Sequence, residues 1–115
     1  MKEQLKDSFA TLLIYGIKAD DVISEQEKEL FCTLMEEHCN VEYPESVKIL
    51  KQTHPTEADI EKHTQIINDF SKNNPMQKMH ILECLNHIIY SDGIENNEYK
   101  VFEKLRDELF PKIEA

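Results

Sequence analysis

Residues 18–31, KADDVISEQEKELF, set the pattern for the whole chain, and a related stretch, YSDGIENNEYKVF, follows at residues 90–102. Each has the pattern of an apolar helix that ends, a short acidic turn, and a second helix that begins. The matching positions are Ile23 with Ile94, Glu27 with Glu98, Leu30 with Val101, and Phe31 with Phe102. The sequence therefore predicts two copies of a helix–acidic turn–helix unit, and the second copy has the shorter turn.

Length and composition indicate one all-α domain. The chain has 115 residues, which is the size of a single domain. It contains two glycines and four prolines, too few for an all-β or low-complexity chain, and 40% hydrophobic residues. We expect a single domain over residues 1–115. It divides into repeat one at about 3–40, a connector at about 41–73 and repeat two at about 74–113.

The hydrophobic periodicity predicts a bundle of about six helices. The predicted ranges are 3–18, 25 to 38 or 39, 45–52, about 57–70, 75–90 and about 96–110. Ser24 with Glu27 has the pattern of a capping box, and Thr56 with Asp59 opens the fourth helix. The buried side of that helix is predicted to contain Ile60, Ile66, Ile67 and Phe70. The apolar richness of residues 75–90 indicates the central helix. Gly16, on the apolar stripe of the first helix, favours a close helix–helix approach.

Net charge and cysteine count restrict the partners and the compartment. The chain has 13 Lys and Arg against 23 Asp and Glu, a net charge of −10. A phosphate backbone would be repelled, so we expect no nucleic-acid partner. No apolar run approaches the ~20 residues that span a bilayer, so no direct membrane insertion is expected. Three cysteines, an odd number, favour reduced thiols and a cytoplasmic protein.

The two acidic turns carry a resemblance to a known family. The first reads Ala19-Asp20-Asp21-Val22-Ile23-Ser24-Glu25-Gln26-Glu27, and the second reads Ser91-Asp92-Gly93-Ile94-Glu95-Asn96-Asn97-Glu98. They resemble the signature of the tellurite-resistance protein B (TerB)-like family. In that signature an apolar helix ends in Ala-Asp-Gly, and an apolar residue, a helix-capping residue and a glutamate follow. In the first turn, Asp21 stands where the family has glycine. In the second turn, Ser91 stands where the family has alanine. The resemblance spans nearly the whole chain.

The resemblance implies a non-enzymatic, all-helical module of stress-response systems. Such modules are suspected of binding a divalent metal ion through their acidic turns and of docking to partner proteins, some of them membrane-associated. The residues that match this expectation are Asp20, Asp21, Glu27, Asp92 and Glu98. Carboxylate oxygens suit calcium or magnesium. Neither turn has the spacing of an EF-hand loop.

Two readings of the acidic turns remain open. In one, the turns hold a cation or present negative charge to a basic partner surface. In the other, Asp20 and Asp92 bond turn amides, and the glutamates complete capping boxes. The second reading corresponds to a metal-free protein-interaction adaptor or a self-associating structural protein.

A second group of candidate ligands lies in the fifth predicted helix. His80, Cys84 and His87 fall on one side of it, opposite Ile81 and Leu85, and they are zinc-type ligands. His80 and Cys84 are one turn apart and could share an ion, but His87 lies about 10 Å along the axis from His80. A full zinc site would therefore need a ligand from another helix. The alternative is a polar flank with Cys84 at its apolar edge.

The remaining histidines and cysteines carry no catalytic signature. His38 lies beside Cys39 at the end of the second predicted helix, where a histidine suits the helix C-terminus. No phosphate-binding glycine loop, Gly-x-Ser-x-Gly or His-Glu-x-x-His occurs. An enzyme using Cys84 or Cys32 with a histidine would require a thiol of depressed pKa. We therefore expect a binding module rather than an enzyme.

Overall fold

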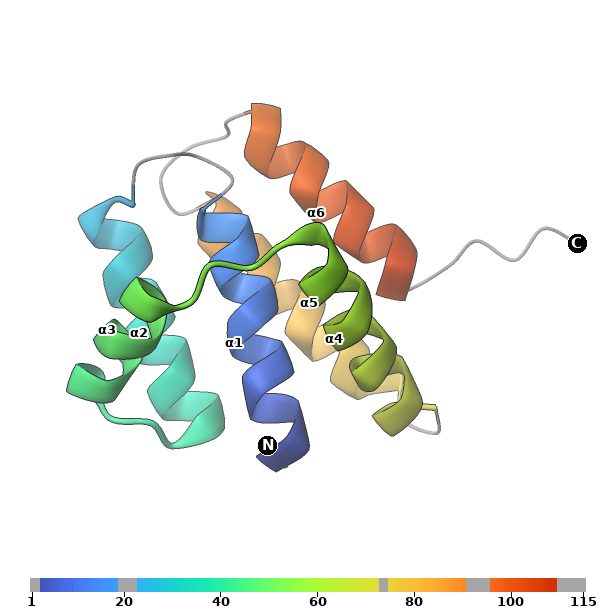
Figure 1. Cartoon of the computed structure of the whole chain (residues 1–115), viewed down its shortest axis with the longest axis horizontal. Coiled ribbons are helices and arrows are strands. Elements are labelled where there is room, and N and C mark those ends of the chain that lie inside the picture. Colours follow the sequence, from blue (N-terminus) through green and yellow to red (C-terminus); the bar gives the residue numbers. More distant parts are fainter. Residues whose placement is uncertain (1–2, 19–22, 73–74, 91–95, 110–115) are drawn as a thin grey trace, which may run out of the picture.

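The structure, a computed structural model, describes residues 3–18, 23–72, 75–90 and 96–109. These residues form helices and no strand (Figure 1), which confirms the expected all-α fold. The helices are α1 (Glu3–Ile17), α2 (Glu25–Cys39), α3 (Tyr43–Gln52), α4 (Glu57–Phe70), α5 (Pro75–Tyr90) and α6 (Asn96–Leu109). Whether the two halves are structural repeats remains a prediction.

Both predicted N-terminal caps are present. Ser24 accepts a hydrogen bond from the Glu27 amide, and the Glu27 carboxylate accepts one from the Ser24 amide. Thr56 and Asp59 form the same reciprocal pair at the start of α4. These bonds satisfy amides that have no partner within the first turn of a helix. At the other end of α2, Asn40 takes the left-handed conformation with φ of 58° and stops the helix.

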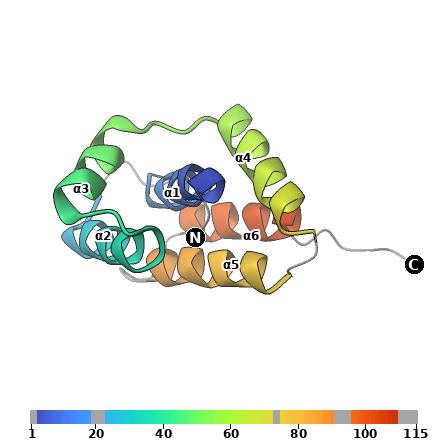
Figure 2. The same ribbon diagram turned by 90° about the horizontal axis from the view of Figure 1, so that it is seen from below.

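Helix α1, not α5, is the centre of the bundle. It packs against α2, α4, α5 and α6, and Figure 2 shows it enclosed by the other helices. Its buried positions occupy nearly its whole circumference beyond the first turn, since Ser8 to Ile14 are all buried. A helix that is apolar on several sides is buried on several sides. The prediction that residues 75–90 form the central helix was therefore wrong, because α5 leaves one side exposed.

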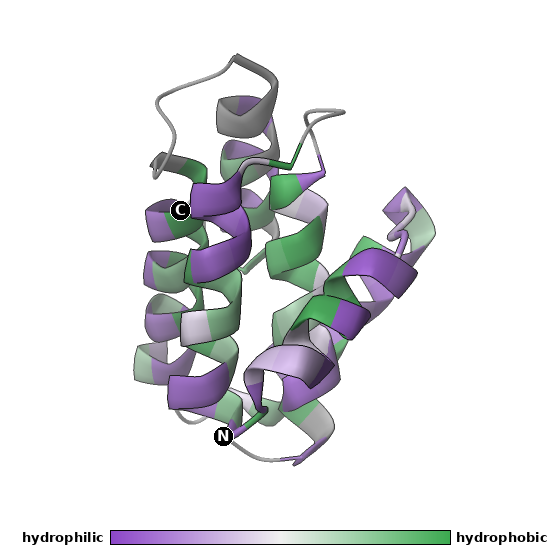
Figure 3. Cartoon of the chain, turned by 90° about the vertical axis from the view of Figure 1, so that its left-hand side faces the viewer, coloured by the Kyte–Doolittle hydropathy of each residue, from purple (hydrophilic) through white to green (hydrophobic). Residues whose placement is uncertain are grey.

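Gly16 allows α1 and α5 to approach closely, as the sequence predicted. A Cβ atom at this position would lie 2.9 Å from Cδ1 of Leu85. Leu85 and Ile89 of α5 are buried, and their side chains lie next to Gly16. In Figure 3, many hydrophobic positions of the coloured helices face neighbouring helices, and many hydrophilic positions face outward.

The buried side of α4 differs from the one predicted. Phe70, expected in the core, is 43% exposed. The face that contacts the bundle contains Ile60, His63 and Ile67 and continues to Ser71. Phe70 lies seven positions after His63, on nearly the same side of α4, but it is the last residue of the helix and is not covered there. His63 is instead buried, and its Nδ1 atom is 2.9 Å from Oγ of Ser8 in α1.

Candidate metal centre

The residues of the predicted acidic-turn site lie mostly outside the described part of the chain. Asp20, Asp21 and Asp92 fall in undescribed segments, and Glu98 lies in α6 without a described side chain. Glu27 is described: it is 2% exposed, and its Oε1 atom accepts the Ser24 amide at 3.1 Å. Glu27 thus has the capping role. A calcium or magnesium site in the turns stays a prediction.

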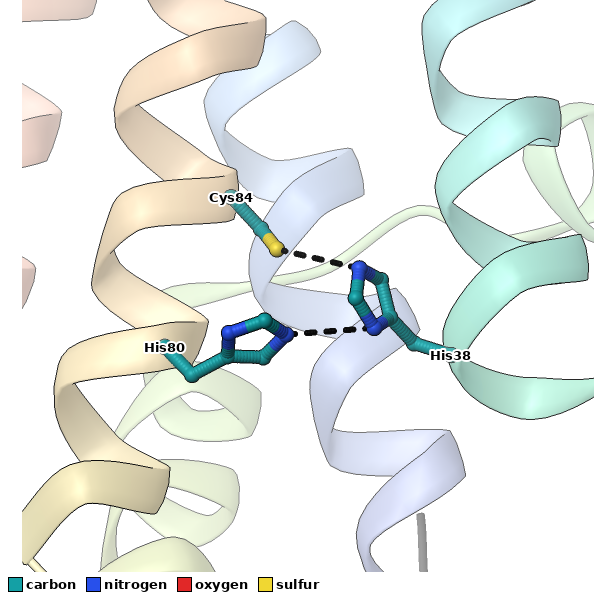
Figure 4. Close-up of side chains that lie close together, drawn as sticks. All are labelled: His38, His80 and Cys84. Atoms are coloured by element: carbon teal, nitrogen blue, oxygen red, sulfur yellow. Dashed lines mark hydrogen bonds between the residues drawn. The ribbon is translucent and has the colours of Figure 1, made fainter.

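Helices α2 and α5 bring together three side chains with metal-ligand chemistry. His38 comes from the last turn of α2, and His80 and Cys84 come from successive turns of α5 (Figure 4). The Nδ1 atom of His38 lies 3.1 Å from Nε2 of His80, and its Nε2 atom lies 3.7 Å from Sγ of Cys84. The His38 imidazole therefore lies between the two α5 side chains and contacts both.

His38 of α2 is the ligand from another helix that a full zinc site with His80 and Cys84 was expected to need. His87, the third predicted ligand, is exposed and is not part of the group; His38 takes its place. Sequence reasoning placed His38 at a helix end but gave it only a capping role. No spacing rule connects it with His80, since the two residues are 42 positions apart. The sequence offered only a histidine near the end of the second predicted helix; its approach to His80 and Cys84 depends on how α2 packs against α5.

The surroundings hold the His38 ring in position. Phe9 of α1, which is fully buried, contacts the ring edge-on with centroids 5.9 Å apart. The His38 and His80 rings also pack edge-on, at 4.5 Å. The contact with Phe9, together with His80 at one ring nitrogen and Cys84 at the other, restricts the imidazole to few orientations. The cluster is graded in exposure, because Cys84 is buried, His38 is half-buried and His80 is exposed.

Burial shifts the pKa values of His38 and Cys84. It lowers the pKa of His38, and the neighbouring His80 lowers it further, so His38 is neutral at pH 7 and its nitrogens can bind a cation. Burial, together with Glu83 and Glu37, raises the pKa of the Cys84 thiol to about 11. A metal ion must displace that thiol proton, so binding would strengthen as the pH rises.

The donor atoms are close enough to share one ion after a small movement. One ligand atom from each residue can be chosen so that all three lie within 4.8 Å of one another. Tetrahedral zinc bonds of about 2.0–2.3 Å place neighbouring donors roughly 3.3–3.8 Å apart. Closing the widest separation takes about 1 Å, which side-chain rotation of the exposed His80 can supply. Two imidazoles and a thiolate favour zinc or another soft ion over calcium or magnesium.

The group offers three ligands, and among the described residues no fourth His, Cys, Asp or Glu joins it. Three protein ligands with an open position are typical of zinc sites that hold water or an exchangeable ligand. Glu37 and Glu83 stand next to His38 and Cys84 in sequence, and both are exposed. Their negative charge acts on Cys84 and would favour a cation there.

The three cysteine thiols have raised pKa values, whereas a cysteine nucleophile needs a lowered one. Burial raises the pKa of Cys32 and of Cys39, as it does for Cys84. A catalytic thiol needs its pKa lowered, because the thiolate is the reacting form. The raised pKa of the Cys84 thiol therefore disfavours its use as a nucleophile with His38 as the base.

Comparison with known proteins places the chain in a family. Residues 6–110 match the family described as "Tellurite resistance protein TerB". No curated protein and no solved structure matches the chain in the corresponding comparisons. None of the described helices combines the length and apolar character required to cross a membrane. Because the match covers nearly the whole chain, the chain belongs to the TerB family.

Proposed function

We propose that this TerB-family chain is a non-enzymatic binding module that holds a zinc-class metal ion between α2 and α5. The observation that carries the proposal is the convergence of His38, His80 and Cys84, whose donor atoms lie within 4.8 Å of one another. Zinc-class ions bind imidazole nitrogen and thiolate sulfur. The preset neutral state of His38 supports the same role.

Binding of the ion would join the two hairpins of the molecule. His38 belongs to the α1–α2 hairpin, and the other two ligands belong to the α5–α6 hairpin. An ion that binds only the folded arrangement stabilises it by mass action. The module would then be tighter when loaded with metal, and the ion would fix the position of α2 against α5. A partner protein could distinguish the two states by that position.

The acidic turns carry a separate proposal that rests on the sequence and the family. Asp20, Asp21 and Glu27 in the first turn, and Asp92 and Glu98 in the second, would bind calcium or magnesium or present charge to a basic partner. Hard cations and soft ions favour different donors, so the two proposals are distinguishable by the ion that each site prefers.

Thermal melts test the proposed function. The wild-type protein would be melted in chelator and then with zinc, calcium or magnesium. At about 100 times the dissociation constant, an ion that binds the folded state adds roughly 2.7 kcal/mol to the free energy of unfolding. We expect zinc to raise the midpoint by about 10 °C, and we expect His38→Ala to abolish that rise.

The control is His87→Ala, which removes a neighbouring exposed histidine that is not part of the cluster. It should respond to zinc as the wild type does. A zinc shift that survives in His38→Ala would contradict the proposed site. A calcium or magnesium shift that is lost in Asp20→Asn/Asp92→Asn would instead place binding in the acidic turns.

A further inference from the structure

A groove lies between α1 and the segment that runs from the end of α2 into α3, which flank one another in Figures 1 and 2. Its volume is about 360 Å³, within the range of about 300–1,000 Å³ typical of ligand pockets. Ala10, Met35, Val41 and Ile49 give it an apolar lining. Val41 and Ile49 are only partly buried, so apolar surface remains accessible in the groove.

The polar side chains of this groove are mainly acidic. Glu3, Asp7 and Glu45 line it, against the single basic residue Lys6. The carboxylate of Glu3 pairs with Lys6 at 3.1 Å, yet its side chain remains 86% exposed. The side chain of Asp7 is 84% exposed, and its Oδ2 atom lies 4.0 Å from Nε2 of His63 in α4. The groove thus combines an apolar floor with a rim of net negative charge that water still reaches.

We propose that this groove docks a basic amphipathic helix of a partner protein. Apolar side chains at i, i+3 or i+4 spacing would enter the groove beside Val41 and Ile49, as in other helix-in-groove complexes. Lysine or arginine residues flanking them would pair with Glu3, Asp7 and Glu45. Complementary charge at the rim increases the association rate and excludes acidic partners. None of the groove residues is a ligand of the proposed metal centre.

Charge complementarity selects this occupant over two others. A second copy of this chain, with net charge −10, would bring like charge to the acidic rim. An anionic lipid surface would be repelled in the same way. Of these three occupants, a basic amphipathic helix matches both the apolar floor and the acidic rim. Binding through the apolar floor can be measured separately from long-range charge attraction. The floor recognises the shape and apolar character of the peptide rather than its charge.

Glu3 and Glu45 also have a local role, which the test must separate from docking. Each lies in the first turn of its helix, where a carboxylate is favoured by the helix dipole. If that were their whole role, replacing them would change the melting midpoint without changing the affinity for a basic helix.

The test is a titration with a synthetic peptide of leucine and lysine, patterned with leucine along one helical face, in chelator. Its controls are a scrambled peptide of the same composition and a version with glutamate in place of lysine. We expect amide NMR signals of Ala10, Val41 and Ile49 to move with the patterned peptide. Binding of the scrambled and acidic peptides should be at least tenfold weaker.

Two protein variants, with one matched control, locate the binding. Glu45→Lys should weaken binding about threefold to tenfold, since a rim charge contributes modestly. Glu61→Lys makes the same charge change on the exposed side of α4, away from the groove residues, and should weaken it less than twofold. Ile49→Glu should weaken it at least tenfold, and circular dichroism checks that this variant is folded.

The outcomes decide the proposal. Equal weakening by Glu45→Lys and Glu61→Lys would mean that net charge alone attracts the peptide, which overturns the docking site. Equal affinity for the patterned and scrambled peptides would do the same. A dimer in sedimentation that Ile49→Glu dissociates would make the groove a self-association surface and would also overturn the proposal.

Discussion

The imidazole of His38 in α2 lies 3.7 Å, through its Nε2 atom, from the thiol sulfur of Cys84 in α5. This contact joins the two hairpins at a point where His80 approaches the other nitrogen of the same ring. Neither helix has a metal site by itself. The three side chains meet because packing around α1 places the last turn of α2 beside the middle of α5.

Removing single histidines should separate ligands from neighbours. His80→Ala deletes one of three donors and should weaken zinc binding at least tenfold, because even groups that only support a ligand cost about 10–100-fold. His87→Ala should change the zinc affinity less than twofold, since His87 lies outside the cluster. Competition with a chromophoric chelator measures both constants. Equal losses in the two variants would contradict the assignment of ligands.

The stability of the metal-free protein should fall in mild acid through His38. Burial lowers the pKa of His38 below its ordinary value of 6.5, so the unfolded chain takes up the proton first. The stabilising contribution is therefore present above about pH 6.5 and is lost as the pH falls through the lower folded value. Urea unfolding at a series of pH values measures this effect. His38→Gln should show a smaller decrease than the wild type between pH 7 and 5, and identical slopes would contradict the account.

Ser8→Ala should destabilise the contact between α1 and α4. It removes the hydroxyl 2.9 Å from Nδ1 of His63, which is only 8% exposed. A buried polar atom without a partner costs about 1–3 kcal/mol. Thr33→Ala is the control, because Thr33 is exposed and bonds only the Glu29 carbonyl within its own helix. It should change the unfolding free energy by less than about 0.5 kcal/mol. Similar values for the two variants would show that His63 does not depend on Ser8.

Gly16→Ala should fail to give the stabilisation expected of an exposed helical position. Alanine gains about 1 kcal/mol over glycine in a helix. Here the new methyl group would lie 2.9 Å from Cδ1 of the buried Leu85, and overpacking costs about 1–3 kcal/mol. The net expectation is a loss of about 0–2 kcal/mol in denaturant unfolding.

A double-mutant cycle checks the cause of that loss. Leu85→Val shortens the side chain that the methyl group meets, so Gly16→Ala should be less harmful in that background by at least about 0.5 kcal/mol. Strict additivity, or a full 1 kcal/mol of stabilisation by Gly16→Ala alone, would contradict the close approach of α1 and α5.

Local features of this fold were predictable from the sequence. The capping pairs Ser24–Glu27 and Thr56–Asp59 use residues three positions apart, so their geometry follows from helix formation alone. The Gly16 approach was predictable because a glycine on the apolar stripe of a helix leaves room for the side chains of a neighbouring helix. Each of these features depends on a single turn or on one face of one helix.

Features that depend on the packing of several helices were not predictable in the same way. The burial of His63 and its contact with Ser8 depend on how α4 packs against α1, and the exposure of Phe70 depends on where α4 ends beyond the bundle. His38 became a candidate ligand only when α2 was placed next to α5. The acidic-turn residues, on which the sequence-based prediction rested, lie mostly outside the described residues.

The most direct test of the metal centre is the absorption spectrum of the protein titrated with cobalt(II), which replaces zinc and reports its ligands. A cysteine thiolate bound to cobalt gives a sulfur-to-metal charge-transfer band, and a tetrahedral site gives intense visible bands. We predict both features at one equivalent of cobalt in the wild type and in His87→Ala. The charge-transfer band should be absent in Cys84→Ser. A spectrum of hydrated, octahedral cobalt in the wild type, or a charge-transfer band that survives in Cys84→Ser, would contradict a metal site at His38, His80 and Cys84.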